Sequence, residues 1–191
     1  MYNDFMKTKN GFLLYILFSA PGIIAHEFSH ELFCVLSGVK VFKVKYFQLR
    51  NPAGYVEHAQ PKNFIQAFFI SVGPFIFGTL LAFGIFIFAI KIVLLKPSPA
   101  YYLQTYLLTT ICLWFGFSIS MACFPSSGDA QVLLSEANRH LFRRFNPFAI
   151  LLYPFVILIK FANHLQKFYF DYIYATIILA LAVYTVLFIL K

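Results

Sequence analysis

Hydrophobic residues fill most of this chain in long runs, and short polar stretches separate the runs. About 20 consecutive apolar residues are enough for a helix to cross a ~30 Å hydrocarbon core. Five runs approach or exceed this length, namely Gly11 to Leu36, Phe64 to Leu95, Tyr101 to Phe124, Pro147 to Ala162 and Phe168 to Leu190. The pattern predicts an all-α polytopic membrane protein with about five transmembrane segments.

Prolines affect the expected shape of two runs. The second run would measure about 48 Å as one helix, and the Gly73-Pro74 pair inside it predicts a kink or a division there. Its N-terminal part would then lie near the membrane interface. The fourth run is short and contains Pro154, so its length suits a tilted or partly re-entrant segment as well as a full span.

The polar stretch between the first two runs has the pattern of a β-hairpin. Apolar and basic residues alternate from Val39 to Tyr46, which is the periodicity of a strand. The turn-forming stretch Asn51-Pro-Ala-Gly54 follows, and then Tyr55 to His58. Two strands alone are marginally stable in water, so we expect the membrane domain to support this hairpin.

A second polar stretch, from Asp129 to Arg144, has the pattern of an amphipathic helix with a basic face that includes Arg143. Such helices are typical of membrane surfaces. The chain shows no internal repeat and no low-complexity linker. We therefore expect a single membrane-embedded domain over residues 1–191.

Composition and charge agree with a membrane protein. Hydrophobic residues make up 61% of the chain and charged residues 12%, whereas soluble domains are about half apolar and a quarter charged. A net charge of +8 would suggest nucleic-acid binding in a soluble protein. Here the Lys and Arg residues lie mostly between the apolar runs, where they orient the chain and meet anionic lipid. The expected partner is therefore the lipid bilayer and not nucleic acid.

The same residues predict which side is cytoplasmic. If all five runs span, nine Lys and Arg residues lie on the side of the hairpin and six on the other. The positive-inside rule then places the hairpin, the basic helix and the C-terminus in the cytoplasm.

The sequence His26-Glu27-Phe28-Ser29-His30 lies inside the first apolar run. On a helix, positions i and i+4 share one face, so both imidazoles can bind one divalent metal and Glu27 can reach a water on it. Ionisable groups at this depth are costly in a membrane, which favours a chemical role. The alternative is a polar cluster that pairs helices inside a bundle.

A catalytic zinc site needs a third protein ligand besides the two histidines. Asp129 is favoured among the seven carboxylates, because it follows the end of the third run on the side where His26 and His30 lie. Pro125 ends that helix and Gly128 allows a sharp turn toward the histidines. The alternative for Asp129 is the N-cap of the next helix.

Other ionisable residues on this side are assigned lesser roles. Glu31 is the rival ligand, but it points about 100° away from His30 and is expected to pair with another residue or with solvent. Glu136 lies too far into the next helix. His58 and His140 are expected to be ordinary interfacial residues, with donation to substrate as the alternative, and His164 is expected to be interfacial too.

These features resemble those of the site-2 proteases, which are intramembrane zinc metalloproteases. The resemblance covers about residues 11–135 and consists of the His26-Glu27-x-x-His30 motif, the basic β segment, the Gly73-Pro74 pair and Asp129. It implies a zinc site formed by the two histidines and the aspartate, with Glu27 as general base. It also implies a three-helix core, with residues 147–190 forming an accessory pair of helices.

The chain resembles a divergent relative of that family, because two of its motifs differ from the family pattern. Ser127-Gly128-Asp129-Ala130 stands where the family commonly has Leu-Asp-Gly. Phe77 stands three residues after Pro74, where the family usually has an asparagine that helps to bind substrate.

The expected function is that of a zinc-dependent intramembrane endopeptidase with one Zn²⁺ and a membrane protein or peptide as substrate. The zinc is inferred from the ligand types, which also suit iron, cobalt or manganese. The alternative is a catalytically inactive relative that acts as a membrane chaperone or regulator. A metal transporter is disfavoured because the apolar interiors of the last three runs hold no His or acidic residue, and a desaturase would need several histidine boxes.

Overall fold

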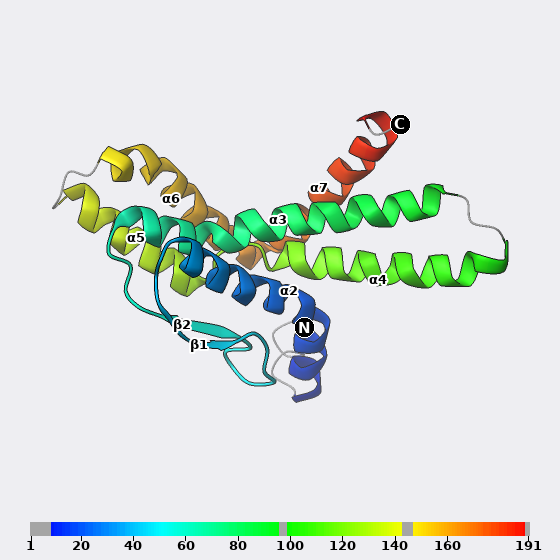
Figure 1. Ribbon diagram of the computed structural model, residues 1–191, viewed down its shortest axis with the longest axis horizontal. Coiled ribbons are helices and arrows are strands. Elements are labelled where there is room, and N and C mark those ends of the chain that lie inside the picture. The colour runs from blue at the N-terminus through cyan, green and yellow to red at the C-terminus, as the bar shows by residue number, and fades with distance from the viewer. Residues whose placement is uncertain (1–8, 96–98, 143–146, 190–191) are drawn as a thin grey trace.

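The computed structural model describes residues 9–95, 99–142 and 147–189, and it is mainly helical (Figure 1). The elements in chain order are α2 (Lys9–Leu36), β1 (Val41–Lys45), β2 (Tyr55–His58), α3 (Phe64–Leu94), a 3-10 turn (Pro99–Tyr101), α4 (Tyr102–Met121), α5 (Ser127–Phe142), α6 (Pro147–Leu165), a second 3-10 turn (Gln166–Phe168), α7 (Phe170–Tyr184) and a π turn (Thr185–Ile189). The predicted helices and the small hairpin are confirmed. Arg143 and Arg144, expected at the end of the amphipathic helix, lie outside the described residues.

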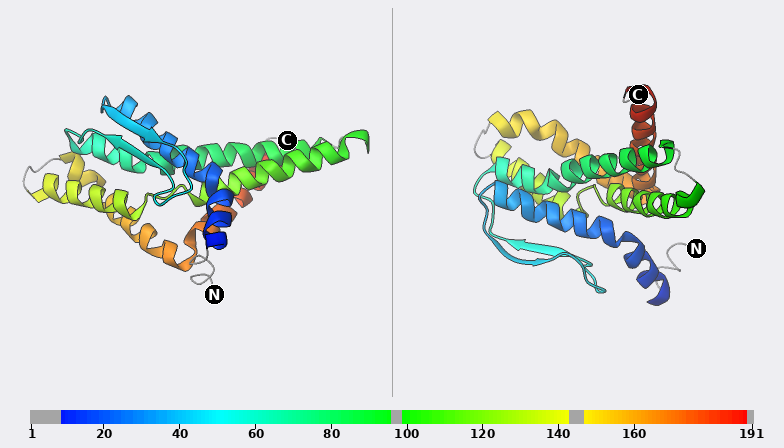
Figure 2. Two further views of the ribbon diagram at one scale, coloured as in Figure 1. Left: turned by 90° about the horizontal axis from the view of Figure 1, so that it is seen from below. Right: turned by 45° about the vertical axis from the view of Figure 1, so that its right-hand side comes forward.

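Helix α3 is the central element of the fold. It contacts α2, α4, α5, α6 and α7 along its length. Figure 1 shows α3 and α4 as an antiparallel pair that extends to one end, whereas α5 and α6 surround the N-terminal half of α3 at the other end. Strands β1 and β2 pair antiparallel and lie along α2, as both views in Figure 2 agree.

Two larger apolar clusters hold these helices together, and a smaller one of Cys34, Val39 and Ile70 joins α2 to α3. The first joins α3, α5 and α6 through Phe64, Phe68, Val72, Leu133, Ala137, Ala149 and Val156. The second joins α2, α3, α4 and α7 through Ala25, Ala82, Phe86, Ile119, Ile178 and Ala182. Helix α5 therefore buries its apolar face against α3 and α6.

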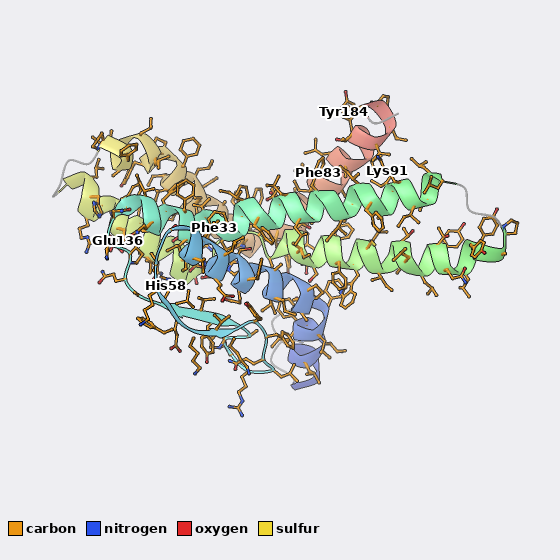
Figure 3. All side chains as sticks on the ribbon, in the orientation of Figure 1. Phe33, His58, Phe83, Lys91, Glu136 and Tyr184 are labelled. Carbon is orange, nitrogen blue, oxygen red and sulfur yellow. The ribbon has the colours of Figure 1, made fainter. Side chains whose placement is uncertain are left out.

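Helix α3 is not divided at Gly73-Pro74, because it continues from Phe64 to Leu94. Gly73 instead allows α2 to approach closely. A Cβ at this position would lie 2.4 Å from the ring of Phe33, whose place beside α3 can be followed in Figure 3.

Four helical stretches in the described part of the chain are long and apolar enough to cross a membrane: 64–94, 99–121, 147–165 and 170–189. The short fourth run is therefore long enough for a full span. These four candidate spans are one fewer than the five transmembrane segments that the sequence predicts. Helix α2 has 28 residues and is not among these four stretches.

Helix α2 bends in its N-terminal half (Figure 1), where it contains Pro21. Beyond the bend it crosses close to α4. The amide of Gly22 donates to Ser118 Oγ at 2.9 Å, and a Cβ on Gly22 would lie 2.1 Å from the Ser118 carbonyl oxygen. This crossing brings the second half of α2 beside the C-terminal end of α4.

Candidate metal centre

The second half of α2 and the first turn of α5 bring His26, His30 and Asp129 together. His26 Nε2 and His30 Nε2 lie 3.1 Å apart, and Asp129 Oδ2 lies 3.8 Å and 3.4 Å from them. Both imidazoles are largely buried. Within the described residues, these three form the one group of His, Cys, Asp or Glu side chains close enough to bind a single ion.

The three separations suit an ion of the size of zinc. Zinc bonds of 2.0–2.2 Å to nitrogen and oxygen, arranged as a tetrahedron, place neighbouring ligand atoms about 3.3–3.5 Å apart. The observed separations of 3.1, 3.4 and 3.8 Å lie around this value. Small side-chain movements would therefore complete three corners of such a tetrahedron.

The other ring nitrogens of the histidines contact backbone carbonyls. His26 Nδ1 lies 2.7 Å from the Ala122 carbonyl oxygen, and His30 Nδ1 lies 3.0 Å from that of Ile70. A carbonyl only accepts hydrogen bonds, so each Nδ1 carries a proton, and in the neutral form of the ring this leaves the lone pair at Nε2. Two lone pairs and a carboxylate then face one point, an arrangement that a cation stabilises.

Asp129 is oriented by Ser126. The Ser126 amide and hydroxyl donate to Asp129 Oδ2 at 3.0 and 2.7 Å, and the Asp129 amide contacts Ser126 Oγ at 3.2 Å. This is a capping box, with Ser126 at the N-cap and Asp129 at the third helical position. The N-cap alternative for Asp129 is therefore wrong, because Ser126 occupies that place.

The charge state of Asp129 also suits a metal ligand. Burial alone would raise the pKa of this carboxyl. Hydrogen bonds from His26, His30 and Ser126, together with the charge of His30 when its ring is protonated, outweigh burial and hold the pKa of Asp129 well below its ordinary value. The side chain is therefore a carboxylate at neutral pH.

Glu27 and the three clustered residues line one cavity of about 440 Å³. The loop between the strands and β2 itself form its other wall, through Asn51, Pro52, Ala53, Gly54, Tyr55, Val56 and His58. Gly54 lies against Glu27, because a Cβ there would be 2.6 Å from Glu27 Cγ. The hairpin therefore covers the carboxylate that the sequence predicts to be the base.

The remaining ionisable residues stand apart from the cluster. The Tyr46 hydroxyl donates to Glu31, as expected for a residue that pairs with another side chain. Glu136 forms an ion pair with Arg139 at 2.7 Å, farther along α5 (Figure 3).

The three other histidines of the sequence analysis differ in their surroundings. His58 lines the cavity, and its Nδ1 lies 2.8 Å from the Ala59 carbonyl oxygen. His140 is buried, with its ring beside Phe64. His164 is exposed on α6.

Sequence reasoning missed the groups that orient the ligands. Ser126 was recognisable, since Ser126-x-x-Asp129 matches the capping-box pattern. Pro74 marks Ile70 as the residue whose helical carbonyl lacks its usual donor. The hairpin loop carries no such local mark, because its contact with Glu27 depends on how distant segments pack.

Comparison of the chain with protein-family models, with curated proteins and with solved structures gives no match. The function therefore has to be inferred from the chemistry of the cluster and the cavity.

Proposed function

We propose that this chain is a zinc-dependent intramembrane endopeptidase that hydrolyses peptide bonds in or near transmembrane segments of membrane proteins. The observation that carries the proposal is the convergence of two Nε2 lone pairs and the Asp129 carboxylate on one point. Three protein ligands with an open fourth position are typical of catalytic zinc sites, whereas structural sites are closed by four.

His26, His30 and Asp129 would hold the ion. Zinc bound there would lower the pKa of a bound water toward about 7 and polarise the scissile carbonyl. Glu27 lines the same cavity and would accept the proton of that water, then return it to the leaving amine. The buried position of both imidazoles keeps their orientation fixed during these steps.

The substrate would enter the cavity in an extended form. In a transmembrane helix the peptide carbonyls are already hydrogen-bonded within the helix, so the cleaved segment has to unwind locally. The hairpin that forms one wall of the cavity offers backbone groups to such an extended segment.

The membrane location is part of the proposal. Four helices long and apolar enough to span support it. The protein would then be a multi-pass integral membrane protein. The positive-inside rule favours an orientation in which its active site faces the cytoplasmic side.

The test measures zinc content and cleavage on the same purified samples in liposomes. The substrate is a fluorescent single-span peptide with a helix-breaking centre. The wild type should contain one zinc and cleave the peptide. Glu27→Gln should keep the zinc and lose cleavage, whereas Asp129→Ala should lose the zinc.

Glu31→Gln is the matched control, because Glu31 lies on the same helix but contacts Tyr46. It should keep both zinc and cleavage. Cleavage by Glu27→Gln would contradict the role of the base, and stoichiometric zinc in Asp129→Ala would exclude the third ligand. A zinc-loaded wild type that cleaves nothing would favour the inactive relative.

A further inference from the structure

Pro74 lies inside α3, one helical turn after the residue whose carbonyl contacts His30. In an unbroken helix the amide of residue 74 would donate to the carbonyl of residue 70. Proline has no amide hydrogen, and its ring pushes that carbonyl away from the helix axis. The Ile70 carbonyl, thus released, lies 3.0 Å from His30 Nδ1.

We propose that Pro74 is a positioning residue for the metal centre. It withholds an amide hydrogen so that the Ile70 carbonyl is available to His30, and this contact fixes the ring form that presents Nε2 to the ion. This inference rests on the proposed metal site and adds to it the backbone group that orients one ligand.

The buried surroundings of His30 restrict the hydrogen-bonding partners that its Nδ1 can reach. Ile70 and His30 are 3% and 7% exposed, so bulk water is kept from the contact. Gly73 lets α2 lie directly against α3 at this level, because Phe33 occupies the space that a Cβ would take. The Gly73-Pro74 pair therefore brings the two helices close and frees the carbonyl at the same place.

The second histidine is oriented in the same manner. His26 Nδ1 contacts the carbonyl of Ala122, the residue that caps the end of α4. In a continued helix the Ser126 amide would donate to that carbonyl, but it donates to Asp129 instead. Each histidine thus contacts a carbonyl that lacks its usual helical donor, because of Pro74 within α3 in one case and the end of α4 in the other.

The test separates the missing amide hydrogen from the proline ring. Pro74→Ala restores the amide. The α-hydroxy analogue of alanine at position 74, introduced by nonsense suppression, gives a backbone ester that has neither the amide hydrogen nor the ring. Pro154→Ala is the control, because Pro154 also lies inside a helix and the residue one turn before it, Ile150, is 53% exposed.

Zinc affinity is measured by competition with a chromophoric chelator. Loss of a hydrogen-bonding partner of a ligand lowers metal affinity by about 10- to 100-fold, and we expect this loss in Pro74→Ala. The ester variant and Pro154→Ala should bind zinc like the wild type. In the metal-free protein, ¹⁵N resonances of the histidine rings should show one neutral form of His30 in the wild type and the ester variant, and a mixture in Pro74→Ala.

Wild-type affinity in Pro74→Ala would overturn the inference. So would an ester variant as weak as Pro74→Ala, because the ring and not the missing hydrogen would then be what matters. A wild type that binds no zinc would overturn the proposed function instead. The ring form of His30 in the metal-free protein would still test the role of Pro74 separately.

Discussion

One oxygen of Asp129 serves two purposes at the start of α5. Oδ2 accepts the hydrogen bonds of the capping box from Ser126, and the same atom faces His26 and His30 at 3.8 and 3.4 Å. The carboxylate is thus oriented by the helix that carries it. Ser126 should therefore affect both the stability of α5 and the affinity for metal.

Ser126→Ala tests this double role. Loss of the N-cap should destabilise the protein by about 1 kcal/mol. Loss of the bond to Asp129 should weaken zinc binding by about 10-fold or more. Thermal unfolding in detergent and zinc competition measure the two effects. Ser127→Ala, one residue farther along and exposed, is the control, and zinc affinity equal in both variants would refute the role of Ser126.

Gly54 is the position at which the hairpin touches the proposed base. A Cβ there would lie 2.6 Å from Glu27 Cγ and 3.1 Å from its Oε1, so Gly54→Ala has to displace the carboxylate. A displacement of about 1 Å costs up to 10²-fold in rate. We expect slower cleavage by about that factor with zinc retained, as measured on the single-span peptide.

Gly84→Ala is the control for this substitution. A Cβ on Gly84 meets nothing within 4 Å, so cleavage should be unchanged. Equal rates in Gly54→Ala and the wild type would show that the hairpin does not constrain Glu27.

At the scale of elements, hydrophobic periodicity predicted the helices and the hairpin to within a few residues. Periodicity could not show what packs against the apolar face of each helix. The apolar face of α5 has the pattern of a membrane-surface helix, yet Leu133 and Ala137 are buried against α3 and α6. A pattern shows that a face is apolar, and only the packing shows whether protein or lipid covers it.

The hairpin is an element with a testable function. If an extended substrate pairs with the edge of β1, prolines placed from Lys40 to Tyr46 should lower cleavage, because proline removes a backbone donor. Zinc content, measured on each variant, should stay at one ion where the fold is kept. Cleavage that remains intact across the whole scan would contradict edge pairing.

For the whole molecule, the site joins residues about 100 positions apart in the chain. The two histidines and Glu27 were recognisable from a five-residue motif, since their spacing alone places the histidines on one helical face. Asp129 required an inference about topology, namely that the ends of two helices meet. The carbonyls of Ile70 and Ala122 belong to ordinary apolar residues, so only Pro74 and the end of α4, which follow them in the chain, indicate their role.

Sidedness is a property of the whole molecule that a fusion can test. The excess of Lys and Arg on the side of the hairpin predicts that this side and the C-terminus are cytoplasmic. A reporter that is active only in the cytoplasm should therefore be active when it is fused to the C-terminus. A reporter active only outside the cytoplasm would contradict this topology and the cytoplasmic active site.

The zinc K-edge X-ray absorption spectrum of the purified wild-type protein is the most direct test of the metal centre. We predict one zinc per chain, with a first shell of nitrogen and oxygen at about 2.0–2.2 Å and the outer-shell scattering of two imidazoles. A protein without zinc, or a shell that contains sulfur at about 2.3 Å or three imidazoles, would contradict a centre formed by His26, His30 and Asp129.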